Sequence, residues 1–145
     1  MHQYPHVYKV AAAAEADKAV LLDSKGLSTL ASMPPEQFDG PGDHWSPETL
    51  LVAAMADCFI LTFRAIARAS QLAWLNLECE TDGILDRVDN VTRFTRFDIR
   101  ATLSVPAGTD EHKATRILEK AEAVCLVSNS LNAEKRLQVR VETAI

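Results

Sequence analysis

The residues of this 145-residue chain with the greatest potential reactivity are three cysteines: Cys58, Cys79 and Cys125. Cys58 directly follows Asp57 inside the segment LLVAAMADCFILTF (50–63), which is otherwise almost entirely apolar. A thiolate is a strong nucleophile, but an unpaired cysteine is also among the most buried residue types and often only fills a core. For Cys58 and Cys125, composition and spacing leave both interpretations open. Cys79 falls on the apolar face of a predicted strand, which favours packing.

Several other kinds of site are disfavoured by the sequence. The four histidines are scattered and no CxxC or Cys/His zinc spacing occurs, so we expect neither a metal nor another cofactor. The net charge of −5 and the absence of a long Lys/Arg cluster argue against a nucleic-acid partner.

The expected compartment is the cytoplasm. The first residues, MHQYPHVYKV, lack the basic and apolar regions of a signal peptide. The apolar segment 50–63 is too short for a membrane span and contains Asp57, so no membrane association is expected. In a reducing compartment the three cysteines would not form a structural disulfide framework.

A long helix is predicted to carry Cys58. Ser46 is a good N-cap, Pro47 suits the first helical position, and nothing interrupts the pattern until about Ser70. The first half of this helix is apolar on all sides, so a single small sheet cannot cover it. Another helix or a second subunit must cover the remainder.

The other predicted elements surround this helix in sequence. Residues 1–32 fit either an alanine-rich helix or short strands, and residues 33–45 form a loop. Alternation predicts strands over 75–81, 97–105 and 137–141, with a turn at Asp89-Asn90. A second helix, capped by Asp110, is expected to run to about Leu126. The order predicts one α+β domain over residues 1–145, without a βαβ repeat.

Two segments carry a family resemblance. SPETLLVAAMADCF (46–59) and AEAVCLVSNSLN (121–132) resemble the motifs of the OsmC/Ohr family of thiol-dependent hydroperoxide reductases. The matching positions are Ser46-Pro47-Glu48, Leu50, Cys58-Phe59, Val124-Cys125 and Ser128-Asn129. The resemblance extends over nearly the whole chain in length and in the order of elements.

The resemblance implies a fold and a set of roles. The fold would be an intertwined homodimer, with antiparallel sheets packed around a long central helix. Cys58 would be the peroxidatic cysteine and Cys125 the resolving one, joined as an intrachain disulfide after reduction of an organic hydroperoxide. Glu48 would pair with an arginine of the N-terminal hairpin, which supports the thiolate. A dithiol or a lipoylated protein would restore both thiols.

The chain departs from the family pattern at that arginine, because no arginine precedes Arg64. A gapless placement puts Lys18 near the position, and His44 is a second candidate cation. A lysine lacks the bidentate fork of a guanidinium group. A non-peroxidatic member that binds a small apolar or electrophilic molecule, or senses oxidation, is therefore the alternative function. Leu126 also replaces a common proline.

The geometry of a helix constrains how these residues combine. Over ten residues, a straight helix rises about 15 Å and turns about 280°, so Glu48 cannot reach Cys58 along it. A shared site requires a bend or two subunits. Val52, Met55, Phe59 and the residues around Cys125 are the expected apolar lining for the substrate, and Asp57 is expected to face a neighbouring backbone or a subunit contact rather than the site.

Overall fold

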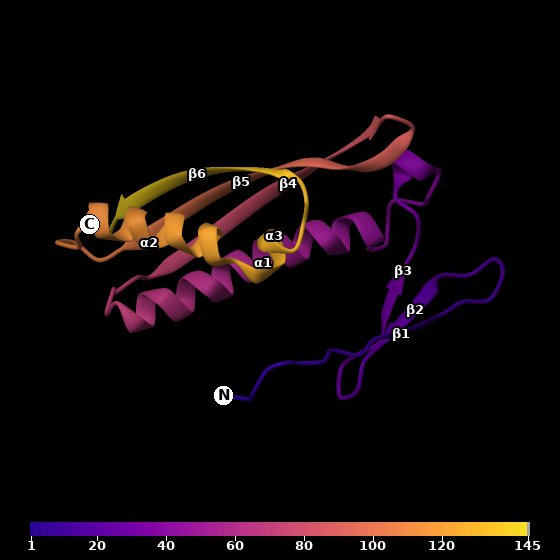
Figure 1. Cartoon of the computed structure of the whole chain (residues 1–145), viewed down its shortest axis with the longest axis horizontal. Coiled ribbons are helices and arrows are strands. Elements are labelled where there is room, and N and C mark those ends of the chain that lie inside the picture. Colours follow the sequence, from indigo (N-terminus) through magenta and orange to yellow (C-terminus); the bar gives the residue numbers. More distant parts are fainter. Residues whose placement is uncertain (145) are drawn as a thin grey trace. The chain divides into compact units, whose positions relative to one another are not determined.

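The computed structural model describes residues 1–144 and divides into two compact units, residues 1–50 and the residues from Leu51 onward. Figure 1 shows the elements of both units along the chain. The first unit carries a small sheet, and the second carries a larger sheet, most of a long helix and two further helices. The α+β class is confirmed. A single domain over residues 1–145 stays a prediction.

The sheet of the first unit resolves the ambiguity of residues 1–32 in favour of strands. Strands β1 (Ala11–Ala13), β2 (Val20–Asp23) and β3 (Leu30–Ser32) pair antiparallel in the order β1-β2-β3. Gly26 has a φ of 79° in the turn between β2 and β3, a conformation that costs glycine little. The polar turns EADK and DSKG thus override the helix propensity of the alanines. The predicted loop contains one short 3₁₀ turn, η1 (Glu36–Phe38).

The long helix α1 (Pro47–Ala69) confirms the predicted boundaries closely. The hydroxyl of Ser46 accepts the backbone N–H of Thr49 at 3.1 Å, and the Thr49 hydroxyl accepts the N–H of Ser46 at 2.9 Å. These reciprocal bonds satisfy donors that the first helical turn leaves free. At the other end Gln71 takes a φ of 56°, and the N–H of Leu72 returns to the carbonyl of Ala67. This left-handed residue terminates the helix.

The sheet of the second unit has the order β4-β5-β6. Strands β4 (Asn76–Val88) and β5 (Val91–Val105) form an antiparallel hairpin whose turn residues, Asp89 and Asn90, both have positive φ. The predicted turn is therefore confirmed. Strand β6 (Glu134–Thr143) pairs parallel to β5, so the expectation of purely antiparallel sheets is wrong for this pair.

The parallel pairing follows from the connection between β5 and β6. This connection contains α2 (Glu111–Val124) and the short α3 (Leu126–Asn129). A helix that returns the chain to the starting end of the sheet makes the next strand parallel, so β5-α2-β6 is one βαβ unit. Asp110 caps α2 as predicted, since its carboxylate accepts the N–H of Lys113 at 3.1 Å.

Helices α1 and α2 pack on one face of the second-unit sheet (Figure 1). The larger core cluster joins α1, α2, β4 and β5 and includes Phe59, Phe63, Leu103 and Leu118, all fully buried. A smaller cluster contains Met55, Phe97 and Ile99. Alternation along β5 thus turns every second side chain into the core, as its sequence predicts.

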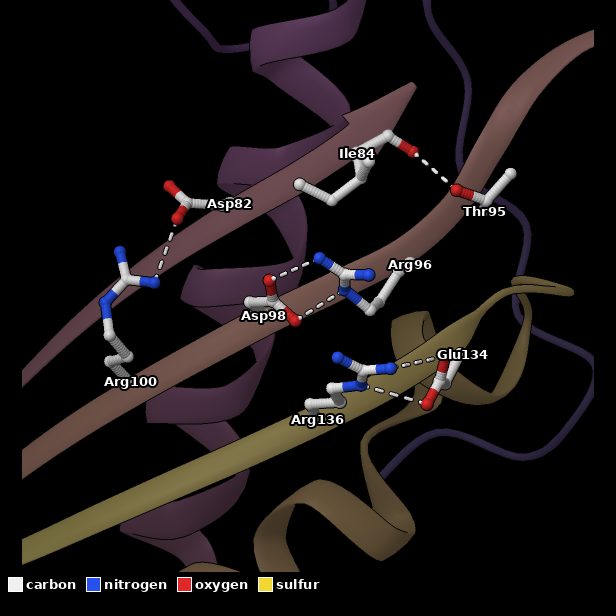
Figure 2. A network of polar contacts seen from close by, with 8 residues as sticks. All are labelled: Asp82, Ile84, Thr95, Arg96, Asp98, Arg100, Glu134 and Arg136. Atoms are coloured by element: carbon white, nitrogen blue, oxygen red, sulfur yellow. Dashed lines mark hydrogen bonds and ion pairs between the residues drawn. The ribbon is translucent and has the colours of Figure 1, made fainter. Parts of the chain in front are cut away.

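The opposite face of this sheet is polar and solvated. Figure 2 shows ion pairs along and between its strands, including Arg100 with Asp82 at 2.9 Å and Arg96 with Asp98 at 2.9 Å. Such surface pairs contribute little to stability, because solvent screens them. Charges of both signs alternate on this face, which gives it no single-sign patch for a charged ligand.

Helix α1 carries more apolar surface than the second-unit sheet covers. In its most apolar 18-residue stretch only 22% of the residues are buried. Among residues 1–144, α1 is also the one helix long and apolar enough to cross a membrane by length and composition, although the core helix of a folded protein meets the same criterion. Residues 50–63 alone are too short to span a membrane, as the sequence indicates, but the complete 23-residue helix is not.

Candidate functional site

Cys58 lies in the middle of α1, in the second unit, and is half-buried. Its sulfur lies 3.8 Å from the hydroxyl oxygen of Thr62, one helical turn further along. Residues four apart share a helix face, so the hydroxyl is held beside the sulfur by the helix itself. Thr62 thus provides a polar contact for Cys58 within an apolar stretch.

Cys125 is fully buried at the junction of α2 and α3. Its ψ of 115° is extended, so the predicted second helix ends at Val124 rather than at Leu126, and a new turn begins after Cys125. Burial raises the pKa of the Cys125 thiol to about 11. The backbone N–H of Ser128 opposes this rise, whereas the neighbouring thiol of Cys58 contributes to it.

The structure therefore brings Cys58 and Cys125 together, although 67 residues separate them in the sequence. Both are free thiols, and their contact joins the middle of α1 to the α2–α3 junction within the second unit. If an oxidant converts one of these sulfurs to an electrophile, the second sulfur already lies next to it as a nucleophile.

An apolar hollow of about 440 Å³ opens beside Cys58. Its lining residues come from one side of α1 and the start of α3: Ala54, Asp57, Cys58, Leu61, Thr62, Ala65, Leu126 and Val127. The predicted lining is right for the residues around Cys125, since Leu126 and Val127 line the hollow, and wrong for the other three residues. Met55 and Phe59 are core residues, and Val52 packs against the smaller core cluster. Asp57, expected to face away, is exposed and contributes to the hollow.

Cys79 occupies a different environment. It lies on β4, packs against both core clusters, and has its sulfur 3.6 Å from the Thr81 hydroxyl. Burial raises the pKa of its thiol, which disfavours the nucleophilic form. This placement agrees with the packing role predicted for Cys79.

Glu48 belongs to the first unit and lines a cavity of about 710 Å³ there, together with Lys18. One carboxylate oxygen of Glu48, Oε2, is buried and has no hydrogen-bond partner within residues 1–144. The Lys18 ammonium group pairs with Glu15 at 2.6 Å, although it lines the same cavity as Glu48. His44 pairs with Asp43 at 2.5 Å and lines another hollow. Of these two cations, Lys18 lines the same cavity as Glu48 and His44 does not.

Sequence reasoning missed two polar residues beside Cys125. The hydroxyl of Ser128 donates to the Glu122 carboxylate at 2.5 Å, and the backbone N–H of Ser128 donates to the Cys125 sulfur. Ser128 stands in the family motif, but Glu122 gave no signal beyond lying three residues before Cys125. Among residues 1–144 no group of three or more His, Cys, Asp or Glu side chains could hold a metal.

Comparison with known proteins places this site in a family. The family model described as OsmC-like protein matches residues 40–140, which include Glu48, Cys58 and Cys125. Over 98 residues, the chain is 30% identical to "Peroxiredoxin OsmC" of Escherichia coli, covering 68% of each sequence.

Two solved structures share the fold. An OsmC-like protein of unknown function from Vibrio cholerae has a TM-score of 0.84 at 17% identity, covering 93% of this chain and 99% of that chain. An organic hydroperoxide resistance protein OsmC from Legionella pneumophila has a TM-score of 0.68 at 21% identity, covering 95% and 99%. With its two motifs, this fold and a family model that matches most of its length, the chain belongs to the OsmC/Ohr family.

Proposed function

We propose that this protein is a cysteine-based peroxidase that reduces organic hydroperoxides. The observation that carries the proposal is the contact between the thiols of Cys58 and Cys125 beside an apolar hollow. The half-buried Cys58, which lines the hollow, is the peroxidatic residue, and the fully buried Cys125 is the resolving residue. The names of the Escherichia coli and Legionella pneumophila relatives support this class of reaction.

The chemistry proceeds in two balanced steps. The Cys58 thiolate attacks the terminal peroxide oxygen, the O–O bond breaks, and the organic part leaves as an alcohol after taking a proton. Cys58 is then a sulfenic acid. The Cys125 sulfur attacks the Cys58 sulfur, the S–O bond breaks, and the oxygen leaves as water with the proton of the Cys125 thiol. An external dithiol, free or on a lipoylated protein, reduces the disulfide and returns both thiols.

The apolar lining of the hollow leads to a substrate preference. Leu61, Ala65 and Val127 would cover the organic part of a hydroperoxide, and each buried methylene contributes about 0.8 kcal/mol. Hydrogen peroxide has no such group. We expect kcat/KM to be at least about tenfold higher for cumene or fatty-acid hydroperoxide, since that requires only about 1.4 kcal/mol of differential transition-state binding.

Steady-state kinetics with both peroxides and dihydrolipoamide as reductant measures this preference. Equal kcat/KM values for cumene hydroperoxide and hydrogen peroxide would contradict the role given to the hollow. Replacement of Leu61 by serine should reduce the preference. Replacement of the exposed Leu75, which lies outside the hollow, is the matched control and should leave the preference unchanged.

A homodimer is the second part of the proposal. The uncovered apolar surface of α1 and the start of α3, with Leu61 at 49% and Leu126 at 71% exposure, is unfavourable in contact with water. A second copy of the chain would cover it, as the family resemblance implies. Light scattering at micromolar concentration should give twice the chain mass, and a well-folded monomer under those conditions would refute the dimer.

Lys18 is the proposed substitute for the family arginine. It lines the same first-unit cavity as Glu48, whose buried Oε2 lacks a partner within the described residues. Lysine offers a point charge rather than the bidentate fork of a guanidinium group. The alternative function, binding of a small molecule or sensing of oxidation, is therefore the second candidate. If the protein reacts with neither peroxide although Cys58 remains reduced and accessible, a binding or redox-sensing role replaces the peroxidase.

A further inference from the structure

Glu122 lies beside the thiol pair without belonging to any motif that identified the site. It occupies the last turn of α2, and its carbonyl accepts the N–H of Cys125 at 3.3 Å. Its side chain is half-buried and receives the Ser128 hydroxyl on Oε1 at 2.5 Å. Ser128 is fully buried, and its backbone N–H binds the Cys125 sulfur. A continuous chain of contacts therefore leads from the carboxylate to the reactive sulfur.

The second oxygen of this carboxylate has an unusual position. Oε2 of Glu122 is buried and has no hydrogen-bond partner within residues 1–144. Burial of a carboxylate oxygen without a hydrogen-bond partner costs desolvation free energy, so the presence of a glutamate at this position needs a reason. Burial raises the pKa of Glu122, whereas the Ser128 hydroxyl and the charge of Lys135 lower it.

The charged and titratable groups around Glu122 come from each neighbouring element. Lys135 is the second residue of β6, Cys79 lies on β4, Cys125 follows α2, and Cys58 on α1 contacts Cys125. The negative charge of Glu122 contributes to raising the pKa of both Cys79 and Cys125, although burial is the largest cause for each thiol. The carboxylate thus favours the protonated form of Cys125.

We propose that Glu122 is a positioning residue for the resolving step, holding the α2–α3 junction that carries Cys125 through its hydrogen bond with Ser128. This inference rests on the proposed peroxidase function. When Cys58 becomes a sulfenic acid, Cys125 loses its proton as the S–S bond forms, and the sulfenic oxygen leaves as water.

Two substitutions separate the hydrogen bond from the charge. Glu122→Gln keeps an oxygen that accepts from Ser128 but removes the charge, whereas Glu122→Ala removes both. Glu119→Gln is the matched control, since Glu119 lies exposed on the same helix one turn earlier. Ser128→Ala removes only the hydroxyl that links Glu122 to the backbone beside Cys125.

Glu119→Gln should behave as the unsubstituted protein does in the assay that follows.

Positioning is tested by the rate at which diamide forms the Cys58–Cys125 disulfide, a reaction that needs no peroxide. Glu122→Ala and Ser128→Ala should slow this reaction at least about fivefold, and Glu122→Gln should restore it to within about twofold of the unsubstituted rate. Disulfide formation at the unsubstituted rate in a folded Ser128→Ala variant would overturn the positioning role. Because this assay contains no hydroperoxide, a failure of the peroxidase proposal would be visible separately, as absent cumene hydroperoxide consumption.

Discussion

Replacement of Cys58 by serine should abolish hydroperoxide consumption, with a loss of at least about a thousandfold in kcat/KM. A serine hydroxyl at this position would lie beside Thr62 and Cys125, neither of which is an effective general base. It also lacks the nucleophilicity and the redox chemistry of sulfur. The measurement is cumene hydroperoxide consumption in the presence of dihydrolipoamide.

Cys79→Ser is the matched control for this loss. Cys79 packs between the two core clusters on β4, so its replacement should lower stability slightly and leave the reaction intact. A serine at position 79 that inactivates a folded protein, with Cys58→Ser still active, would reverse the assignment of the two thiols.

Replacement of Cys125 by serine should produce a different defect, a single turnover. Cys58 would still reduce one equivalent of peroxide, but the sulfenic acid would have no adjacent thiol to condense with. Steady-state consumption should fall at least about a hundredfold unless the external thiol attacks Cys58 directly. A burst of one equivalent of alcohol, measured by rapid quench, checks this expectation, together with trapping of Cys58 by dimedone.

Full steady-state activity in Cys125→Ser would contradict a resolving role for Cys125. The contact between the two thiols would then have a packing role only. A reaction with no burst at all would indicate that the variant had lost the environment of Cys58, which thermal melting of the variant tests independently.

The sequence predicted the elements of the second unit well because their signals are local. Ser46 and Asp110 cap α1 and α2 with their own side chains, and the Asp89-Asn90 turn needs two residues that tolerate positive φ. Alternation along β5 identified its buried face. The parallel pairing of β6 was not predicted, because strand direction depends on how α2 returns the chain rather than on a local pattern.

The site was predictable only in part. Cys58 and Cys125 were identified through a family resemblance, and their contact depends on the packing of α1 against the α2–α3 junction. Met55 and Phe59 were misplaced in the substrate lining because a helix that is apolar on all sides does not reveal which side meets the core. The Glu122–Ser128 contact was missed because it depends on the break at Cys125, where an extended ψ directs the two side chains together.

The most direct test of the central claim is the intact mass of the protein after one equivalent of cumene hydroperoxide, without reductant. The two-cysteine mechanism predicts a mass lower by about 2 Da, from loss of the two thiol hydrogens, and a peptide that links Cys58 to Cys125 after digestion. An unchanged mass, a gain of oxygen that persists on Cys58, or a linkage through Cys79 would contradict it.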